Sequence, residues 1–303
     1  MAVSTGDFSK ALWPGVRKWI GLSYQDLQRF YDKIAYVTPS DKAYEEIMSY
    51  AGLGVAAAIP SETGEVPFYN TRQGFLNRYT HAKYGIGFEV TEDAMDDDQY
   101  NVVERGSKEI PRSLLTTKEI IVHNVLNNAF STTYGDGVSL CNSAHPNVNG
   151  GTWSNVPTTD ADISEAALED ASISISNWTD DAGIKINLQP RLLIANNAQK
   201  FDLIRLFKTE KQVDTANNNI NAIVNDNTFK DGFMTDNYIT DTDAWFILTT
   251  LPKEDGIIYF DRYKGDRFDS TMDFNTRVAR FIGYTRFVVG VGDPKCIFGC
   301  QGG

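Results

Sequence analysis

Cys141 and His145 stand four residues apart in the Asn- and Gly-rich stretch DGVSLCNSAHPNVNGG, and both residue types bind zinc. Cys296 and Cys300 form a second pair with the same spacing, so the two pairs together would offer four ligands. The pairs are far apart in the sequence, however, and the second one flanks an apolar run. Free cysteine is more often a small buried apolar residue. We therefore expect structural cysteines, with no bound metal and no cofactor.

His145 allows two hypotheses, a base that activates a cysteine nucleophile or a histidine that holds a loop. A nucleophilic pair needs a third group to orient the base and a pocket for a substrate, and no sequence motif supplies either. Pro146 and Asn147 follow the histidine directly and are typical of turns. We therefore expect a loop histidine whose ring hydrogen-bonds to nearby backbone.

Asp96, Asp97 and Asp98 form the densest group of carboxylates. Such a run could bind a divalent cation or act in acid–base catalysis, but it also suits the start of a helix, where the helix dipole stabilises negative charge. We favour the second interpretation. A later acidic stretch lacks the regular offsets of a calcium loop, and the sequence contains no phosphate-binding loop, no GxSxG and no HExxH. The chain is predicted not to be an enzyme.

Charge and hydropathy exclude further classes of protein. The net charge is −12, from 28 Lys and Arg residues against 40 Asp and Glu residues, which argues against a broad phosphate-binding face. No run of about 18 apolar residues predicts a membrane helix, and the first residues lack the pattern of a secretory signal. The odd number of cysteines argues against a disulfide framework. These features favour a globular protein made and kept in the cytoplasm.

Two helices are predicted to position these residues. Apolar residues at helical spacing predict a long helix over 98–130, which Pro111 should bend or interrupt because it removes one hydrogen bond. A second helix should begin at Asp162, with Glu165 as its capping-box partner. Its apolar face consists of Leu168, Ala171, Ile175 and Trp178.

The first 50 residues carry short amphipathic pieces, such as 25–36 with Leu27, Phe30, Tyr31 and Ile34, and resemble an arm without a core of its own. Residues 65–71 and 85–91 then read as the two strands of a long hairpin. The connecting residues, 72–84, are basic and aromatic in an otherwise acidic protein, so we expect them to contact an acidic neighbour. The candidates for subunit contacts are Arg72, Phe75, Arg78, Tyr79, Lys83 and Tyr84.

The second half of the chain is rich in predicted strands. A buried strand at 191–196 and a helix at 198–209 precede an Asn-rich loop, 213–227, which Ile220 and Ile223 should anchor. Strands follow at 244–250, 256–263, 277–291 and 296–300. Two main helices with mostly hairpin-connected strands indicate an α+β fold.

The order of these elements resembles that of the major capsid proteins of tailed bacteriophages. Four pieces resemble the Mu-type branch of phage head subunits: YGIGFEVTEDAMDDDQY (84–100), VLNNAFS (125–131), LCNSAHPN (140–147) and RFVVGVGDPKCIFG (286–299). The resemblance spans most of the chain except 213–237. The family often has an aromatic or aliphatic residue where Cys141 stands, which further favours a packing role for this cysteine.

The resemblance implies the Hong Kong ninety-seven type fold. On this chain it places the N-terminal arm at 1–52, the extended hairpin called the E-loop at 53–92, the peripheral domain with its spine helix at 93–190 and 266–290, and the axial domain at 191–265 and 291–303. It implies a subunit that forms hexamers and pentamers of an icosahedral phage head in the virion, assembled in the host cytoplasm around double-stranded DNA. Expected partners are other copies of the chain, a separate scaffolding protein, a portal and cement proteins.

Two other hypotheses stay open at this point. An encapsulin-like nanocompartment is similar in fold but encloses a cargo enzyme, so the contents of isolated particles would separate it from a phage head. A metal-dependent hydrolase would use Cys141, His145 or the Asp96–Asp98 run. Stoichiometric zinc in the purified protein would favour the hydrolase.

Overall fold

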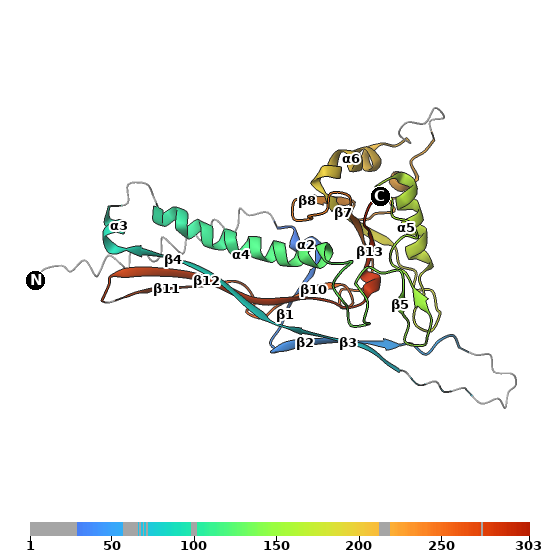
Figure 1. Cartoon of the computed structure of the whole chain (residues 1–303), viewed down its shortest axis with the longest axis horizontal. Helices are drawn as coiled ribbons and strands as arrows, with labels where there is room; N and C mark the ends of the chain where they lie inside the picture. The colour runs from blue at the N-terminus through green and yellow to red at the C-terminus, as the bar shows by residue number, and fades with distance from the viewer. Residues whose placement is uncertain are drawn as a thin grey trace, which may run out of the picture. The chain divides into compact units, whose positions relative to one another are not determined.

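The computed structural model describes residues 29–56, 66, 68, 70, 72–97, 102–211, 219–273 and 275–303. The chain forms two compact units. The first unit comprises Met1–Tyr44, Thr80–Val122 and Tyr259–Val289, and the second comprises Glu45–Tyr79, His123–Ile258 and Gly290–Gly303. Helices and mostly antiparallel strands mix in both, so the predicted α+β class is confirmed (Figure 1). Among the described residues, no helix has the length and apolar character needed to cross a membrane.

The first unit is built on a five-stranded sheet. Its strands run in the order β1 (Tyr36–Pro39), β10 (Ile257–Asp261), β12 (Val278–Val291) and β11 (Arg267–Met272), while β4 (Ala82–Thr91) also pairs with β12. The short helices α2 (Tyr31–Ile34) and α3 (Glu92–Asp96) lie before β1 and after β4 in the chain.

Helix α4 (Val102–Asn127) packs on this sheet (Figure 1). Ile110 and Leu114 of the helix join Phe281 of β12 in one buried cluster, with Phe88 and Phe268 packed against it. The helix approaches the sheet most closely above Gly283 in β12. A Cβ atom at that position would clash with the Ile110 side chain and would meet that of Leu114 at 3.1 Å.

The predicted interruption at Pro111 is wrong, because α4 continues through it as one helix of 26 residues. Proline leaves the carbonyl group of Ser107 without its helical partner, at a cost of roughly 3 kcal/mol. Ile110 and Leu114, on either side of the proline, are each 2% exposed in the same core. Burying large aliphatic side chains contributes about 1.5–3 kcal/mol each, which offsets the proline and keeps the helix whole.

The predicted hairpin of 65–71 with 85–91 is also wrong. Residues 85–91 do form a strand, within β4, but it pairs with β12 from Ala82↔Phe287 to Thr91↔Val278. The supposed connection contains a strand, β3 (Arg72–Thr80), which pairs with β2 (Tyr44–Ala51). Of residues 65–71, the described positions 66, 68 and 70 belong to no strand, and the others lie outside the described residues. Stacked aromatic rings such as Phe88 and Phe281, 5.1 Å apart, stabilise the observed pairing.

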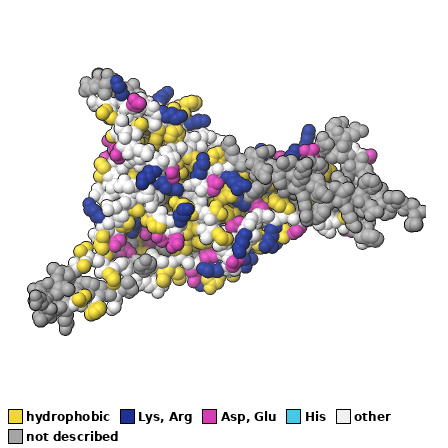
Figure 2. All heavy atoms as spheres, turned by 180° about the vertical axis from the view of Figure 1, so that it is seen from behind, with side chains coloured by type: hydrophobic (Ala, Val, Ile, Leu, Met, Phe, Trp, Pro, Cys, Tyr) yellow, Lys and Arg dark blue, Asp and Glu magenta, His cyan; other side chains and the backbone are white. Residues whose placement is uncertain are grey.

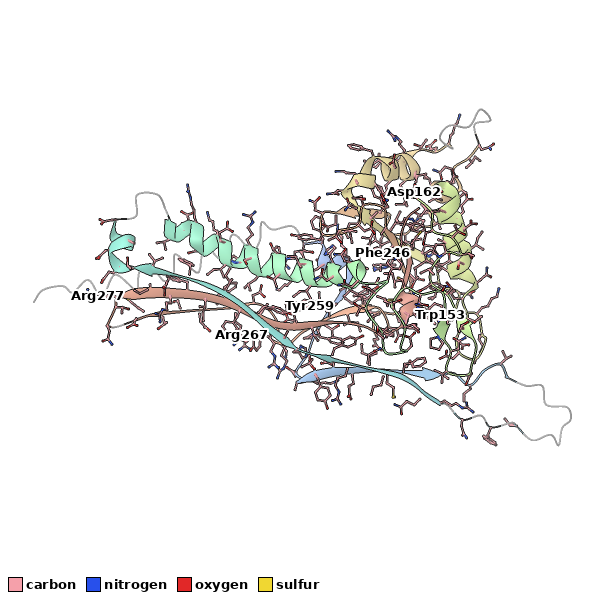
Figure 3. All side chains as sticks on the ribbon, in the orientation of Figure 1. Trp153, Asp162, Phe246, Tyr259, Arg267 and Arg277 are labelled. Carbon is pink, nitrogen blue, oxygen red and sulfur yellow. The ribbon has the colours of Figure 1, made fainter. Side chains whose placement is uncertain are left out.

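The second unit contains a four-stranded sheet in the order β13 (Ile297–Cys300), β9 (Trp245–Thr249), β7 (Pro190–Asn196) and β8 (Phe233–Asp236). All residues of β9 and β13 are buried, as continuous apolar runs predict. Phe246 lies among the packed side chains of this unit (Figure 3). The strands expected at 191–196, 244–250 and 296–300 are thereby confirmed.

Helix α5 (Glu165–Asn177) confirms the second predicted helix and its apolar face, since Leu168, Ala171 and Ile175 are buried. The cap differs from the prediction. Ser164 is the N-cap, and its hydroxyl accepts a hydrogen bond from the Ala167 N–H at 3.2 Å. Asp162 instead accepts a hydrogen bond from the Gly303 N–H at 3.3 Å.

The segment after β7 continues through a turn of 3-10 helix, η2 (Asn197–Gln199), into α6 (Lys200–Lys208), as predicted. Residues 212–218 of the expected Asn-rich loop lie outside the described residues, and its end forms α7 (Ala222–Asn225). Ile223 is buried as an anchor, but Ile220 is 68% exposed, so that half of the prediction is wrong. A second 3-10 turn, η3 (Pro294–Cys296), precedes β13.

Candidate functional site

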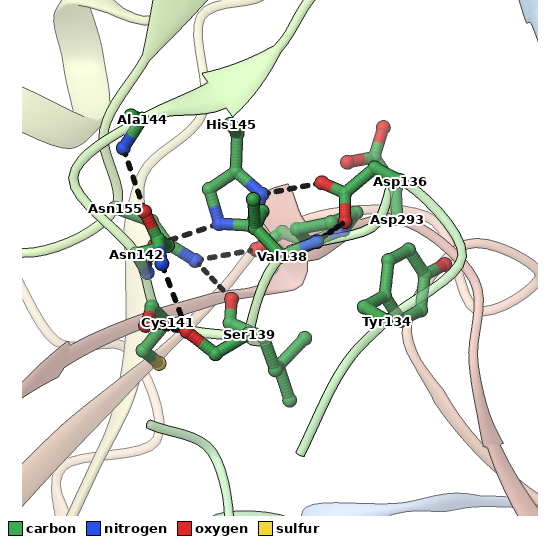
Figure 4. Close-up of polar contacts among 12 residues, drawn as sticks. Tyr134, Asp136, Val138, Ser139, Cys141, Asn142, Ala144, His145, Asn155 and Asp293 are labelled. Atoms are coloured by element: carbon green, nitrogen blue, oxygen red, sulfur yellow. Dashed lines mark hydrogen bonds and ion pairs between the residues drawn. The ribbon is translucent and has the colours of Figure 1, made fainter. Parts of the chain in front are cut away.

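The loop around His145 in the second unit is held by buried side-chain hydrogen bonds (Figure 4). His145 begins β5 (His145–Pro146), which pairs with β6 (Thr152–Trp153), and its side chain is fully buried. Its Nδ1 lies 2.6 Å from Asp136 Oδ2, and its Nε2 lies 3.1 Å from Asn155 Oδ1. The ring therefore joins the turn before β5 to the segment after β6.

Asn155 is the centre of this network and is itself fully buried. Its Oδ1 also accepts a hydrogen bond from the Asn142 N–H at 2.8 Å. Its Nδ2 donates to three main-chain carbonyl oxygens, those of Leu140 at 2.7 Å, Pro294 at 3.2 Å and Ile297 at 3.2 Å. One amide side chain thus connects the loop to the last strand of the unit.

An aromatic ring lies against His145, and a cation lies against that ring. The indole of Trp153 stacks on the imidazole with ring centres 4.7 Å apart, and Lys295 Nζ lies 4.6 Å from the centre of that indole (Figure 3 places Trp153). Lys295 Nζ is also 3.9 Å from Asp293 Oδ2. The Lys295 cation, two carboxylates and the imidazole of His145 therefore lie close together beside one indole.

The sequence pattern indicated His145 but not its partners. The expectation that the ring bonds to nearby backbone is wrong, because both partners are the side chains of Asp136 and Asn155. Asp136 gives a weak signal, as a turn residue before Gly137 in the same stretch. Asn155 gives none, since its role depends on the main-chain carbonyl groups of Leu140 and of the distant segment 294–297.

The three cysteines are free and buried. Burial raises the pKa of the Cys141 thiol, and it does the same for Cys296 and Cys300. A raised pKa disfavours the thiolate, which is the form that binds metals and attacks electrophiles. Among the described residues, no group of three or more His, Cys, Asp or Glu side chains could hold a metal ion. Cys141 packs against Gly299, where a Cβ atom would meet its Sγ at 2.7 Å.

The acidic run does not sit at the start of the long helix as a unit. Asp96 ends the short helix α3 and Asp97 is its C-cap, while Asp98 lies outside the described residues. Thr91 provides the N-cap of α3, and its hydroxyl accepts a hydrogen bond from the Ala94 N–H at 3.3 Å. The expectation that the run caps the long helix is therefore wrong for Asp96 and Asp97.

The predicted contact residues are divided between the two units. Arg72, Phe75 and Arg78 lie on β3, where Arg72 is exposed and the Phe75 N–H donates to Ser49 Oγ at 2.9 Å. Arg78 Nη2 lies 2.5 Å from Glu46 Oε1 of the paired strand, so this arginine already has an acidic partner within the chain.

Tyr79, Lys83 and Tyr84 also make contacts within their own unit. The Tyr79 hydroxyl donates to the Val291 carbonyl at 3.0 Å and accepts from the Val291 N–H at 3.1 Å, and burial raises the pKa of Tyr79 to about 12. In the first unit, Lys83 Nζ lies 4.6 Å from the ring centre of Tyr284. The Tyr84 ring lies 5.0 Å from that of Phe287.

The β2–β3 hairpin carries exposed apolar side chains that sequence analysis did not single out. Met48 of β2 is 51% exposed and Leu76 of β3 is 48% exposed. The contacts of Glu46 with Arg78 and of Ser49 with Phe75 show that the two strands run antiparallel. Further exposed apolar residues between the strands are Leu53, Val55, Val66 and Phe68. Several large apolar side chains exposed on one hairpin are typical of an interaction surface.

The chain is similar to solved phage capsid chains and to a virus-like particle protein. A cyanophage P-SCSP1u capsid chain has a TM-score of 0.59 at 10% identity, covering 89% of this chain and 86% of that one. A virus-like particle protein of Pyrococcus furiosus has a TM-score of 0.56 at 13% identity, covering 94% and 97%. A procapsid chain of bacteriophage JBD30 has a TM-score of 0.54 at 15% identity, covering 98% and 75%. At such identities the likeness shows the fold alone. No curated protein sequence matches.

The family model described as phage capsid protein matches residues 77–299, well over half of the chain. The match covers β4, α4, the His145 loop, α5 and the sheet of the second unit. The resemblance to phage head subunits and the fold that it implied are thereby confirmed. The chain therefore belongs to the phage capsid protein family, has the Hong Kong ninety-seven type fold, and is a structural, self-associating component of the virion.

Proposed function

We propose that this chain is the major subunit of an icosahedral phage head, in which it forms hexamers and pentamers that enclose double-stranded DNA. The observation that supports this best is the pairing of a phage capsid family match with a hairpin whose apolar side chains are exposed. Exposed apolar area of this kind is unfavourable in a lone subunit and is stabilised when a neighbouring copy covers it.

The hairpin supplies the subunit contacts in this proposal. Met48, Leu76 and the half-buried Phe75 provide apolar contact area, and the exposed Arg72 provides a charge for an acidic neighbour. Arg78 and Lys83 contribute at the edges of the contact. Tyr79 and Tyr84 contribute indirectly, by holding the chain next to the hairpin in place. Tyr79 hydrogen-bonds to the Val291 carbonyl, and the Tyr84 ring packs on that of Phe287.

The four-part division into arm, E-loop, peripheral domain and axial domain, with the boundaries given above, is part of the same proposal. We also propose a separate scaffolding protein, a portal and cement proteins as partners, assembly in the host cytoplasm, and no enzymatic activity. DNA would be enclosed without specific contacts. On the face drawn in Figure 2, cationic and acidic side chains are interspersed. This distribution supports a surface without a continuous basic patch for the DNA phosphates.

A second candidate is a protein shell that encloses protein cargo. This candidate is supported by the similarity to the Pyrococcus furiosus virus-like particle protein, which covers 94% of this chain. Both candidates require closed particles, and they differ in the contents.

Electron microscopy of the expressed chain, with and without its cognate scaffold, tests the proposal. We expect closed or tubular particles, and hexameric and pentameric capsomers in their reconstructions. Particles purified from infected cells should contain nuclease-protected DNA. Particles that hold a folded cargo protein and no DNA would favour the second candidate, and a chain that stays monomeric under all these conditions would contradict both.

A further inference from the structure

The two ring nitrogens of His145 both face oxygen atoms that act as acceptors. The orientation of the Asn155 amide is fixed by its other bonds, because Nδ2 lies near three carbonyl oxygens and Oδ1 accepts the Asn142 N–H. The atom that faces His145 Nε2 at 3.1 Å is therefore the amide oxygen. A carbonyl oxygen cannot donate a hydrogen bond, so Nε2 must carry the proton.

Nδ1 also faces an acceptor, the carboxylate of Asp136, and needs a proton to form a hydrogen bond with it. It lies 2.6 Å from Oδ2 of Asp136, whose other oxygen accepts the Val138 N–H at 3.1 Å. A neutral imidazole has one N–H and can satisfy only one of its two partners, whereas the imidazolium satisfies both. The short distance to Asp136 fits a hydrogen bond between two charged groups.

The other groups around the ring fit a cation. The titratable groups that line the small pocket beside it are Tyr134, Asp136, Asp181, Asp293 and Lys295. Burial raises the pKa of Tyr134, which keeps that phenol neutral. Lys295 lies near Asp293, so a charged His145 leaves Asp136 paired instead of alone in a buried site.

The loop around His145 is also in contact with the β2–β3 hairpin. Ser49, Phe75 and Asn77 of the hairpin line the same pocket as Asp136. Asn77 lies directly on the turn that carries Asp136, since its side chain leaves no room for a Cβ atom at Gly135. A change in the turn therefore reaches the hairpin through direct contact.

We propose that the Asp136–His145–Asn155 network is a proton-dependent latch, which seats the hairpin while His145 carries both ring protons and releases it when one proton is lost. With one proton gone, either Asp136 or Asn155 loses its bond to the ring. The turn of residues 134–138 then loosens. The part of the hairpin that contacts it, at Ser49, Phe75 and Asn77, detaches from the loop. Rising pH is the trigger, and the device acts within one chain.

NMR of the full-length chain labelled with ¹⁵N-histidine tests the protonation state directly. The chain has three histidines, so His81→Gln and His123→Gln assign the signals without touching the latch. We expect two ring N–H signals from His145 at neutral pH, and the loss of one as the pH rises. A single ring N–H signal at neutral pH would overturn the proposal, and because this measurement uses the native latch it does not depend on any latch variant folding.

Trypsin cleavage after the exposed Arg72 tests the coupling, with cleavage after the exposed Lys211 as the internal reference. We expect the Arg72/Lys211 cleavage ratio to rise with pH in step with the NMR signal. In Asp136→Asn it should be raised about tenfold or more already at neutral pH, as expected from losing a hydrogen bond between charged groups. Asp181→Asn lines the same pocket without touching the ring and should behave as wild type. A ratio independent of pH in the wild type would overturn the latch, whether or not the chain assembles into shells.

Discussion

Lys118 and Asp266 form an ion pair inside the first unit, with Lys118 Nζ 2.7 Å from Asp266 Oδ1. Their side chains are 3% and 2% exposed, so the pair is shielded from water. Lys118 projects from α4, and Asp266 directly precedes β11. The pair therefore fastens the long helix to the connection between two strands of the sheet on which the helix packs.

Lys118→Met should destabilise the first unit strongly. The change keeps most of the side-chain volume but leaves the Asp266 carboxylate buried without its cation, which typically costs about 3–5 kcal/mol. Chemical denaturation followed by circular dichroism measures this loss.

The double variant Lys118→Met/Asp266→Leu provides the control, because replacing both charges removes the unpaired carboxylate. We expect it to recover most of the lost stability. Removing the exposed pair of Arg112 with Glu109 should change the stability by less than about 1 kcal/mol. A Lys118→Met variant as stable as the wild type would show that the buried pair does not hold the helix.

The three cysteine thiols should resist alkylation in the folded chain. All three are buried and their pKa values are raised, so little thiolate is present at neutral pH. Mass spectrometry after iodoacetamide treatment should show no adduct under native conditions and three adducts in denaturant. Rapid alkylation of Cys141 in the native chain would contradict its packing role, and so would zinc bound at stoichiometric amounts.

Local patterns predicted the helices and strands well, because the spacing of apolar side chains is set by the element that contains them. Helix α5 shows this, since Leu168, Ala171 and Ile175 were expected on one face and are buried there. The hairpin was misplaced because pairing depends on distant residues. β4 could pair with any strand of suitable length. Contacts between side chains distant in the sequence select β12, among them the stacking of Phe88 on Phe281, the packing of Tyr84 near Phe287 and the ion pair of Glu89 with Arg280.

The site was less predictable than the fold. His145 stands out because histidines are rare in this chain, but Asn155 is one of many asparagines. Asn155 is the centre of the network because the fold places the carbonyl groups of Leu140, Pro294 and Ile297 around its amide. A backbone carbonyl is present at every residue, so the sequence gives no signal for such a cluster.

Asp236 should contribute stability that is lost in acid. Burial raises the pKa of this carboxyl, but the ring of His123, 3.1 Å away, and the N–H groups of Asn237 and Tyr238 outweigh burial and lower it overall. A folded pKa below the unfolded value of about 3.9 means that the contribution is complete well above pH 4 and disappears as the pH falls through the folded pKa. Asp236→Asn should therefore flatten the acid side of the stability curve measured by denaturation between neutral pH and about pH 3. An unchanged acid slope in this variant would contradict the assignment.

Gly292→Ala should destabilise the second unit. An added Cβ atom would meet Asp255 backbone atoms at 2.5 to 2.7 Å, and backbone cannot rotate away as a side chain can. We expect a loss of roughly 1–3 kcal/mol or more, as for other overpacked sites. Gly85→Ala is the matched control, because its nearest contacts would be at an ordinary 3.4 Å. Equal melting temperatures for the two variants would contradict the close approach.

The last prediction concerns the β2–β3 hairpin, and the variant that tests it must keep both strands. Removing residues 62–90 would destroy β3 and most of β4, and β4 is part of the sheet of the first unit. Replacing residues 54–70 with a short Gly-Ser linker keeps both strands and removes only their connection. We expect this variant to melt as cooperatively as the wild type, because the cores of both units are untouched, but to form no closed particles.

Point variants separate the loss of a contact surface from an effect of the linker. Met48→Ser with Leu76→Ser removes exposed apolar area from the hairpin, and Ile173→Ser removes a side chain that is 61% exposed on α5. None of these side chains is needed for a core, so all three changes should leave the melting temperature within a few degrees. If the hairpin is the contact surface, the double variant gives fewer particles in electron microscopy than the wild type. Ile173→Ser then gives more particles than the double variant. Full particle yields from both the linker variant and the double variant would place the subunit contacts elsewhere, since neither the connection nor the apolar side chains of the strands would then be required.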